Sequence, residues 1–528
     1  MKHSSLYFII LPLLLLLVAT LSVFPFYQYY IDPDAVGYLS VAERYAKGDG
    51  YHAINGYWSP WSCWLTAILI KGGMASFKAG ILINTLGASG FLIASHILFR
   101  KFLSNTTLIG LLNTTLALFL VYAIYKQSFA DLWSFFFLLV IVLSLMHPRF
   151  IQRSWLWCAV GALGALAFMA KAYAFPYVIL LVSTVTIVIF RKEQPAFALK
   201  TGLKVVAITL GTMLFFTLPW LMALHQKYGM WTTGTAGTLN LSWYLIGHPY
   251  YKDGIQLLVP PNPVDALMYW EDPYLSNGAT PHFWNSPSLF FLQIVRVGYN
   301  ALKAFMSMNE ISAFFLPTAL LYVFVISKKY QSSSIWSPLI IPAWAFVLFP
   351  LGYILIHFES RYLWFLLPFS LLMVGMAYEH YGQQCSRLLR NVFLVIVCLS
   401  YLSYPVLEMK VLYRSGEQEY QLAKQLREAA ISGSFATNIS QSKDMQKVMR
   451  LAWFSKNPYY YMPTQPFHSE LLLQELERYH IKYYFHFDAP GTIANYQLCD
   501  RKGKPFPTVF IDSTTMGLQV FQLHDEPR

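Results

Sequence analysis

Two aspartates, Asp32 and Asp34, stand two positions apart in the stretch IDPDAV, directly after a long apolar run. A carboxylate can accept a proton from an attacking hydroxyl group, and two carboxylates at this spacing can also hold a divalent cation such as Mg²⁺ or Mn²⁺. The structural alternative is a helix cap, because an aspartate at a helix start favours the positive N-terminal dipole. The pair is therefore a candidate for a catalytic base, a metal site or a cap.

Further ionisable residues interrupt or border apolar stretches. Lys171 lies within GALGALAFMAKAYAF, Asp131 follows the segment KQSFA, and the segment HFESRYLWFLLP carries Glu359, Arg361 and Tyr362. An ionisable group in such a setting is costly and hence a functional candidate, and an arginine there can make forked hydrogen bonds to a phosphate. Snorkelling of the long side chains to lipid headgroups, and capping of a helix by Asp131, are the structural alternatives.

The composition places these residues in a membrane protein. Hydrophobic residues make up 56% of the 528 positions and charged residues only 12%, against about 25% charged in an average soluble domain. Because a span needs about 20 mainly apolar residues, the pattern predicts an α-helical polytopic protein with about 11 transmembrane helices. The runs lie near 6–26, 79–99, 107–125, 129–146, 155–170, 174–190, 203–223, 311–327, 336–357, 363–380 and 391–408.

Basic residues beside these runs predict the orientation of the chain. The positive-inside bias places the N-terminus in the cytoplasm and the C-terminus outside. The net charge of +12 then reflects topology and not nucleic-acid binding, since Lys and Arg form no basic stripe. The polar segments 27–78, 224–310 and 412–528 fall on the extracytoplasmic side, and the short apolar run 61–70 is expected to be re-entrant or interfacial.

The first polar segment predicts an amphipathic helix lying on the membrane surface. Asp32 is its expected cap, Pro33 its first helical position and Gly48 its end, with Tyr38 on the apolar side and Arg44 on the polar side. The loop 224–310 is dense in Trp and Tyr, whose faces stack on sugar rings and also anchor membrane surfaces.

The segment after residue 411 predicts a small extracytoplasmic α/β domain, 412–528, distinct from a transmembrane domain, 1–411. Strands are expected at 434–438, 459–462, 482–487, 508–512 and 518–523, and helices at 441–455 and 469–480. The alternation predicts a partly parallel sheet with helical cover. Docking of an acceptor or partner, and structural support of the outer face, are equally open roles.

The motifs together resemble the GT-C superfamily of integral membrane glycosyltransferases. They are D-x-D after the first run, then A-E-R-Y and G-D-G-Y, and later E-S-R-Y-L…L-P. The likeness is greatest to the family 39/83-like branch, which includes the protein O-mannosyltransferases and the lipid A aminoarabinose transferase, and it covers about residues 1–410. It implies a polyprenyl-phosphate-sugar donor, inverting transfer to a lipid, glycan or protein acceptor, and a place in the bacterial inner (plasma) membrane.

The resemblance also implies roles for single residues. Asp34 matches the favoured base, while Ala35 stands where many relatives have a Glu, so that Glu's part in metal or acceptor binding does not carry over. Lys171 and Arg361 match basic residues expected to meet the donor phosphate. The remaining candidates for substrate binding are Glu359, Tyr362, Tyr38 and Asp131.

Two other classes of function compete with a transferase. A flippase or transporter of lipid-linked sugars would place charges near the bilayer midplane in broken helices related by a repeat, whereas the charges here lie at the outer boundary. A receptor or assembly scaffold would require neither the D-x-D loop nor Lys171.

Overall fold

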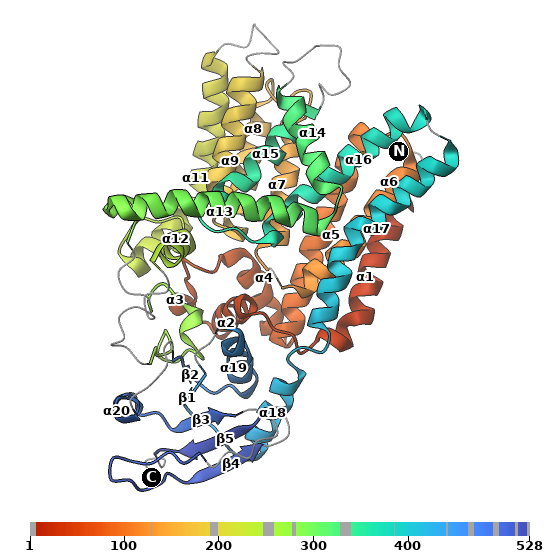
Figure 1. Cartoon of the computed structure of the whole chain (residues 1–528). Coiled ribbons are helices and arrows are strands. Elements are labelled where there is room, and N and C mark those ends of the chain that lie inside the picture. The colour runs from red at the N-terminus through yellow and green to blue at the C-terminus, as the bar shows by residue number, and fades with distance from the viewer. Residues whose placement is uncertain are drawn as a thin grey trace. The chain divides into compact units, whose positions relative to one another are not determined.

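The structure is a computed structural model that describes residues 7–127, 129–190, 199–246, 258–276, 281–327, 339–384, 386–439, 442–462, 469–488, 496–512 and 516–524. It is mostly helical, with a five-stranded sheet near the C-terminus (Figure 1). The chain divides into two compact units. The helical unit comprises Met1–Pro25, Ser59–Gly234 and Ser286–Val411, and the mixed unit comprises Phe26–Trp58, Thr235–Asn285 and Leu412–Arg528.

Apolar helices make up most of the helical unit. Within the described residues, six are long and apolar enough to cross a membrane by length and composition: α1 (Tyr7–Tyr27), α5 (Ser76–Phe102), α6 (Thr106–Tyr125), α11 (Leu199–Tyr228), η7 (Ser360–Leu366) with α16 (Leu367–Tyr381), and α17 (Arg387–Leu412). Shorter apolar helices are α7 (Asp131–Leu145), α8 (Ser154–Ala170), α9 (Ala174–Ser183) running into η2 (Thr184–Phe190), α14 (Phe315–Ser327) and α15 (Ile340–Leu355). Each predicted apolar run coincides with one of these helices, which confirms the polytopic helical class.

The packing of α8 against α11 fixes the backbone that carries Lys171. Gly161 on α8 faces α11, and a Cβ added there would overlap the carbonyl oxygen of Thr209, so only glycine allows this approach. Helix α8 ends at Ala170, and Lys171 follows in an extended conformation with φ −155° and ψ 122°. The side chain of Lys171 therefore leaves the chain at a break between α8 and α9.

Helix α4 (Pro60–Lys71) occupies the short apolar run predicted at 61–70. Its 12 residues are too few to cross a bilayer as a helix, and it packs against α5 and α8. A re-entrant or interfacial placement for α4 stays a prediction.

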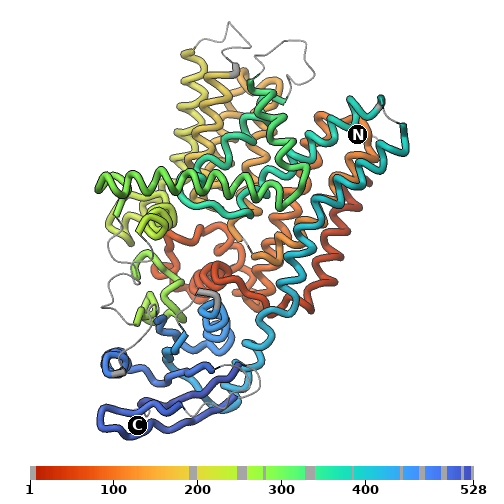
Figure 2. The backbone as a smooth tube through the Cα atoms, in the orientation of Figure 1, coloured from red at the N-terminus to blue at the C-terminus, as the bar shows by residue number. Residues whose placement is uncertain are grey.

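Helix α13 (Pro287–Ile311) lies in the region expected to be an external loop. Ser286 caps its first turn by accepting a hydrogen bond from the Leu289 N–H at 3.2 Å, and Pro287 takes the first helical position. Figures 1 and 2 show α13 crossing the direction of α8 and α11. The loop 224–310 thus contains a 25-residue helix that the sequence analysis did not predict.

The polar side of α13 is buried, and its apolar side is exposed. Gln293, Asn300 and Ser307 recur at seven-residue intervals on the buried side. Exposed apolar side chains are Phe290, Phe291, Ile294, Val295, Leu302 and Phe305. This inverted arrangement is the opposite of a surface helix in a water-soluble protein, where the apolar stripe faces the core.

The buried side of α13 holds the end of α15. Asn300 Nδ2 donates to the carbonyl oxygens of Ile354 and Ile356 at 3.0 and 3.3 Å, and Gln293 donates to the carbonyl of Leu355. Carbonyls at a helix C-terminus have no partner within the helix, so α13 supplies donors that α15 lacks. The segment His357–Arg361 begins directly after this anchored end.

In the mixed unit, α2 (Pro33–Lys47) begins and ends as predicted. Asp32 caps it by accepting a hydrogen bond from the Asp34 N–H at 3.0 Å, Pro33 is its first residue, and Gly48 ends it with φ 86°. One expectation was wrong: Arg44, placed on the polar outer side, is 7% exposed. The reason is long-range pairing, because carboxylates from elsewhere in the mixed unit surround its guanidinium.

The C-terminal sheet has the order β2-β1-β3-β5-β4. Its strands are β1 (Phe435–Thr437), β2 (Tyr459–Tyr460), β3 (Tyr483–Phe487), β4 (Thr508–Asp512) and β5 (Leu518–Gln522), with α18 (Glu417–Glu428), α19 (Ser442–Ser455) and α20 (Ser469–Arg478) between or before them. Strand β1 pairs in parallel with β2 and β3, while β5 is antiparallel to β3 and β4. The predicted partly parallel sheet is confirmed, and α18 was not predicted.

The remaining short elements are α3 (Gly50–Ala53), α12 (Ala236–Ile246), η4 (Tyr269–Glu271), η5 (Phe283–Asn285) and η8 (Gly382–Gln384).

Candidate functional site

Lys171 forms a buried ion pair with Asp131 in the helical unit. The Lys171 ammonium contacts Asp131 Oδ1, and the two side chains are 17% and 2% exposed. Asp131 is the first residue of α7, where the partial positive charge of a helix N-terminus stabilises a carboxylate. Asp131 is thus the carboxylate at a helix start that the sequence predicts. It is also the direct partner of Lys171, the candidate functional cation.

Aromatic rings enclose the Lys171 ammonium. Its Nζ lies 4.3 Å from the ring centre of Tyr362 and 5.3 Å from that of Tyr353. The two rings are stacked, with centres 3.9 Å apart and planes at 16°. A cation over an aromatic face is stabilised without water, so this box holds the ammonium where solvent is largely excluded.

Arg361 joins this pair to a second carboxylate. Its Nε lies 3.9 Å from Asp131 Oδ2 and 2.8 Å from Glu359 Oε2. His357 Nε2 and the Tyr362 hydroxyl also approach Glu359 Oε1, at 3.3 and 3.2 Å. Burial opposes ionisation of Glu359, but Arg361 and His357 hold the pKa of its carboxyl well below the usual range. Lys171, Asp131, Glu359 and Arg361 form what we call the charge cluster, whose formal charges sum to zero.

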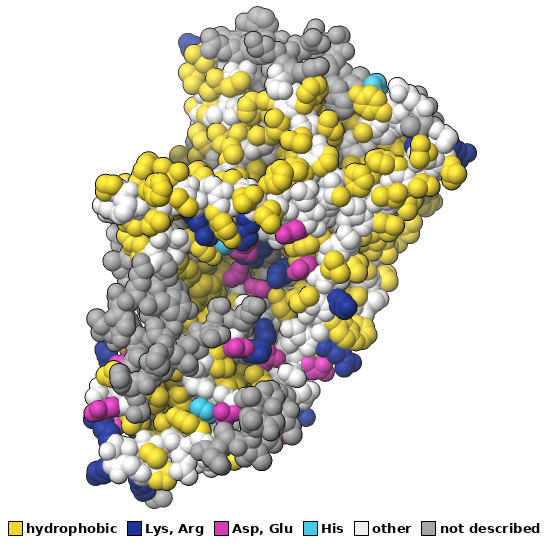
Figure 3. Space-filling model, in the orientation of Figure 1, with side chains coloured by type: hydrophobic (Ala, Val, Ile, Leu, Met, Phe, Trp, Pro, Cys, Tyr) yellow, Lys and Arg dark blue, Asp and Glu magenta, His cyan; other side chains and the backbone are white. Residues whose placement is uncertain are grey.

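A polar cavity of about 780 Å³ adjoins the charge cluster. Its charged lining residues are Lys126, Lys303, Glu310, Glu359, Arg361 and Glu408. Its aromatic lining residues are Tyr122, Tyr299, Trp364 and Tyr404. Figure 3 shows acidic and basic side chains gathered in a hollow on this face, bordered by hydrophobic ones. Carboxylates, hydroxyls and aromatic faces are groups that bind sugar rings.

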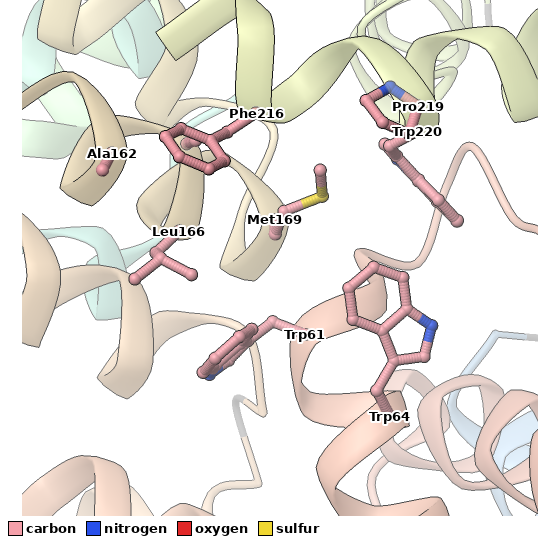
Figure 4. A pocket seen from close by; sticks show the side chains of 9 residues that line it. Trp61, Trp64, Ala162, Leu166, Met169, Phe216, Pro219 and Trp220 are labelled. Atoms are coloured by element: carbon pink, nitrogen blue, oxygen red, sulfur yellow. The ribbon is translucent and has the colours of Figure 1, made fainter. Parts of the chain in front are cut away.

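An apolar cavity of about 500 Å³ lies among α4, α8 and α11. Trp61 and Trp64 come from α4, Leu166 and Met169 from α8, and Trp220 from α11 (Figure 4). No charged residue lines this cavity in the described part of the chain, which suits hydrocarbon and not a polar headgroup.

The mixed unit places Asp32 and Asp34 in different settings at the start of α2. Both oxygens of Asp32 accept hydrogen bonds, from the Asp34 N–H and from the Tyr30 hydroxyl at 3.0 Å each. Asp34 is half-buried in the first helical turn. The capping interpretation thus describes Asp32, and Asp34 is the carboxylate of the pair that does not serve as the cap. Tyr38, one turn further on, is buried against Trp58 with ring centres 5.0 Å apart.

A metal site at Asp32 and Asp34 stays a prediction. Within the described ranges, no group of three or more His, Cys, Asp or Glu side chains is arranged to hold a metal ion. The oxygens of Asp32 already accept an N–H and an O–H, and these donors would have to move for a cation to bind.

Arg44 and three carboxylates form a network of ion pairs that was not predicted from the sequence. The guanidinium contacts Asp49 at 2.8 Å, Asp265 at 3.0 Å and Glu271. Hydrogen bonds from Arg44 lower the pKa of Asp265, whereas burial of Glu271 outweighs the effect of Arg44 and raises its pKa to about 6. The segment 262–272 is thereby tied to α2. The acidic residues of YWEDP were visible in the sequence, but Arg44, the partner of Glu271, is 227 positions away.

The helical unit also adds residues that sequence reasoning did not select. Tyr353 lies on α15 and His357 follows that helix. The available signal was the place of His357 at the start of the motif HFESRY. Lys126 follows α6, Lys303 and Glu310 lie seven positions apart on α13, and Glu408 lies on α17. Their meeting in one cavity depends on how these helices pack.

Among solved structures, the chain is similar to ArnT from Cupriavidus metallidurans, bound to undecaprenyl phosphate and in the apo state. The identity is 12% in both cases, the TM-scores are 0.54 and 0.53, and the matches cover 97% and 96% of this chain and 97% of each ArnT chain. The chain has a GT-C fold. The sequence itself matches no protein-family profile and no curated protein.

A weaker match is the archaeal oligosaccharyltransferase AglB from Archaeoglobus fulgidus, in complex with an inhibitory peptide and a dolichol-phosphate. It has 11% identity and a TM-score of 0.43, and covers 92% of this chain and 69% of AglB. This score is too low to support an argument.

The GT-C fold extends over more of the chain than the motifs indicated. Because the ArnT match covers 97% of the residues, the expectation that the likeness stops near residue 410 was wrong. The motifs lie only in the early loop and in η7. A structural comparison uses the whole backbone, and the match to ArnT includes the C-terminal segment. With its GT-C fold and apolar helices, the chain is an integral membrane protein.

Proposed function

We propose that the protein is a glycosyltransferase that moves a sugar from a polyprenyl-phosphate-linked donor to a lipid, glycan or protein acceptor at the extracytoplasmic membrane face, with inversion. The observation that carries the proposal is the charge cluster with its adjoining polar cavity, in a chain with a GT-C fold. The ArnT structure bound to undecaprenyl phosphate supports a lipid phosphate as the carrier.

In the proposed mechanism an acceptor hydroxyl attacks the anomeric carbon of the donor sugar. The new carbon–oxygen bond forms as the bond to the phosphate oxygen breaks, and the bond electrons leave with the polyprenyl phosphate. Asp34 takes the hydroxyl proton, and Lys171 and Arg361 stabilise the charge on the departing phosphate. A phosphate is a good leaving group, so no general acid is required.

The neutral sum of the charge cluster sets a condition on phosphate binding. Arg361 is already engaged by Glu359, so a phosphate must take the place of that carboxylate to receive the forked hydrogen bonds of the guanidinium. The side chain of Glu359 is 36% exposed, whereas that of Asp131 is 2% exposed. Glu359 is therefore the carboxylate that can yield, and Asp131 the one that keeps Lys171 in place.

The test is sugar transfer in proteoliposomes with a panel of labelled polyprenyl-phosphate sugars. The wild type is expected to form a labelled product, and Asp34→Asn to lose it. Asp444→Asn is the matched control, because Asp444 pairs with Lys447 and its side chain is 47% exposed. Full activity in Asp34→Asn would remove the base assignment. Movement of labelled lipid between leaflets without a new glycosidic product would replace the transferase by a flippase.

A further inference from the structure

Within the mixed unit, the residues just before α2 are held by the C-terminal segment, 412–528. The ring of Tyr29 lies against that of Tyr420 on α18, with ring centres 4.6 Å apart. Tyr420 in turn meets Phe454 on α19 edge to face, with ring centres 5.4 Å apart. Aromatic pairs at these separations attract each other beyond the effect of their buried area. Tyr29 is thereby joined to two helices of the C-terminal segment.

Gly416 makes the same approach through the backbone. It directly precedes α18 and has φ 85°, and a Cβ added to it would overlap the carbonyl oxygen of Tyr29. Any side chain here would have to displace that carbonyl, and the positive φ itself favours glycine. Two positions earlier, the Arg414 N–H donates to the carbonyl of Phe26 at 3.0 Å. The start of α18 thus packs directly on the chain that leads into α2.

This chain continues to the two carboxylates. Tyr30 is 6% exposed, and its hydroxyl donates to Asp32 Oδ2 at 3.0 Å. Burial, followed by the charge of Asp32, raises the pKa of Tyr30 well above its ordinary value, so the hydroxyl keeps the proton that it donates. Asp32 accepts the Asp34 N–H with its other oxygen, and its carbonyl accepts the Val36 N–H at 3.1 Å. The backbone at Asp34 is therefore fixed by Asp32, which is fixed by the residues before it.

The two helices that hold Tyr29 are joined to each other and to α2. Glu419 of α18 and Arg450 of α19 form a buried ion pair, with Arg450 Nη2 2.6 Å and Nε 3.0 Å from Glu419 Oε1. Helix α19 packs against α2, and Lys456, just beyond α19, lies 3.3 Å from both carboxylate oxygens of Glu43. An exposed pair of this kind adds little stability by itself, but it provides a contact near the C-terminal end of α2.

We propose that the C-terminal segment positions Asp34 for proton transfer, with Gly416 and Tyr420 as the positioning residues. Both contact Tyr29, and they act on the reaction only through the backbone that leads to Asp34. The inference rests on the proposed function for the role of Asp34 as the base. It gives the segment 412–528 a part in the rate of the chemical step and not in the capture of an acceptor.

Docking of an acceptor is the competing role for this segment. A polar cleft of about 500 Å³ borders the start of α18, and its basic lining residues are Arg414, Lys447 and Arg450. Their carboxylate partners lie at 3.9, 3.1 and 2.6 Å and are Glu417, Asp444 and Glu419. An anionic acceptor would have to displace these carboxylates, whereas the contacts with Tyr29 are already formed. The positioning role is therefore favoured.

Hydrogen exchange at the start of α2 tests the positioning role without requiring catalysis. The amides of Asp34 and Val36 are followed by mass spectrometry of the peptide 32–38 in the full-length protein in detergent. Tyr420→Ala and Gly416→Ala are expected to speed their exchange about tenfold, because the contacts that hold the preceding chain are lost. Unchanged exchange in both variants would overturn the inference.

Matched controls come from the same segment. Tyr479 is a half-buried tyrosine whose ring contacts Tyr460. Gly503 has φ 79°, and a Cβ added to it would meet no atom within 4 Å in the described part of the chain. Tyr479→Ala and Gly503→Ala therefore remove a ring contact or strain a turn away from Tyr29, and exchange of the peptide 32–38 should stay at the wild-type rate. Equal acceleration in these controls would reduce the effect to general loss of stability.

Transfer kinetics separate positioning from docking. Tyr420→Ala and Gly416→Ala are expected to lower kcat about ten- to a hundredfold, because a small displacement of a catalytic group is costly. The KM values for donor and acceptor should not change, and Tyr420→Phe, which keeps the ring, should retain kcat. A raised acceptor KM at unchanged kcat would make the segment a docking module and overturn the positioning role.

The outcomes also distinguish this inference from the proposed function. If Asp34→Asn abolishes transfer while Tyr420→Ala and Gly416→Ala keep the wild-type kcat, the transferase stands and the positioning role is wrong. If the wild type transfers no sugar from any donor but exchange at 32–38 accelerates only in the Tyr420 and Gly416 variants, the C-terminal segment does hold α2, and the transferase proposal is what fails.

Discussion

Arg361 Nε lies 2.8 Å from Glu359 Oε2, and the same nitrogen lies 3.9 Å from Asp131 Oδ2. The nearer carboxylate is the more exposed of the two. The Arg361 guanidinium is therefore paired with Glu359, which can move away, and lies beside Asp131, which is fixed by burial. This arrangement makes Glu359 a built-in competitor of any anion that approaches Arg361.

Replacing Glu359 by Gln is expected to lower the KM for the donor. The amide keeps the shape of the side chain and releases Arg361 from a charged partner, so the phosphate no longer displaces a carboxylate; we expect an effect of about three- to tenfold. Initial rates at varied donor concentration measure it. A raised KM would instead make Glu359 a substrate-binding residue.

Breaking the Lys171–Asp131 pair is expected to destabilise the helical unit. Asp131→Ala leaves a buried ammonium without its carboxylate, at a cost of about 3 to 5 kcal/mol. The double variant Lys171→Met with Asp131→Leu removes both charges and should recover most of the thermal stability in detergent. The double variant should still be inactive, because it lacks the Lys171 ammonium that is proposed to bind the donor phosphate. Recovered transfer in this variant would exclude Lys171 from the chemistry.

Asp32 and Asp34 are expected to separate into a structural and a catalytic residue. Asp32→Asn keeps a capping oxygen and should retain transfer, whereas Asp32→Ala should cost about 1 kcal/mol of stability. Asp34→Asn should abolish transfer at unchanged stability. Paired measurements of thermal midpoint and rate decide the matter, and loss of transfer in a stable Asp32→Asn variant would contradict the assignment.

Glu271 is expected to make the mixed unit less stable as the pH rises. Burial raises its pKa to about 6 although Arg44 lowers it, and an unfolded glutamate titrates near about 4.3. Between these two values the folded state retains a proton that the unfolded state releases. The contribution of protonated Glu271 to the stability of the mixed unit is therefore full below about pH 4 and is lost as the pH passes about 6. Relative to Glu271→Gln, the wild type should lose about 2 kcal/mol between these limits. If the difference in thermal midpoint between the wild type and Glu271→Gln does not change with pH, Glu271 is not the cause of the pH dependence.

Removal of divalent cations is expected to leave transfer within about twofold of the untreated rate, since the oxygens of Asp32 are occupied by hydrogen bonds. The measurement is the initial rate with EDTA, followed by addition of Mg²⁺ or Mn²⁺. Complete loss with EDTA and recovery with one of these ions would restore the metal site at Asp32 and Asp34.

Local patterns accounted for the elements whose cause is local. The apolar runs, the cap at Asp32, the glycine stop at Gly48 and the strand–helix alternation after 434 depend on neighbouring residues, and each was found where predicted. Helix α13 was missed although Ser286 and Pro287 mark its start. Its polar and apolar sides are exchanged relative to a helix of a soluble protein, and the whole region 224–310 was predicted to be a loop.

The candidate site shows the limit of local reasoning more sharply. Lys171, Asp131, Glu359 and Arg361 were each selected from the sequence, but their pairing depends on how α7, α8 and η7 pack. Arg44 was misplaced for the same reason, since Glu271 lies 227 positions away. Their roles in substrate binding stay predictions.

The hydrogen bonds from α13 to the end of α15 have a consequence for biosynthesis. Asn300 and its acceptor Ile354 are separated by 54 positions, so α13 leaves the ribosome well before the carbonyl that it must meet. Until then its buried stripe has no such partner. The segment that carries Glu359 and Arg361 is translated later still, so the charge cluster is completed only after the whole of α13 has been synthesised.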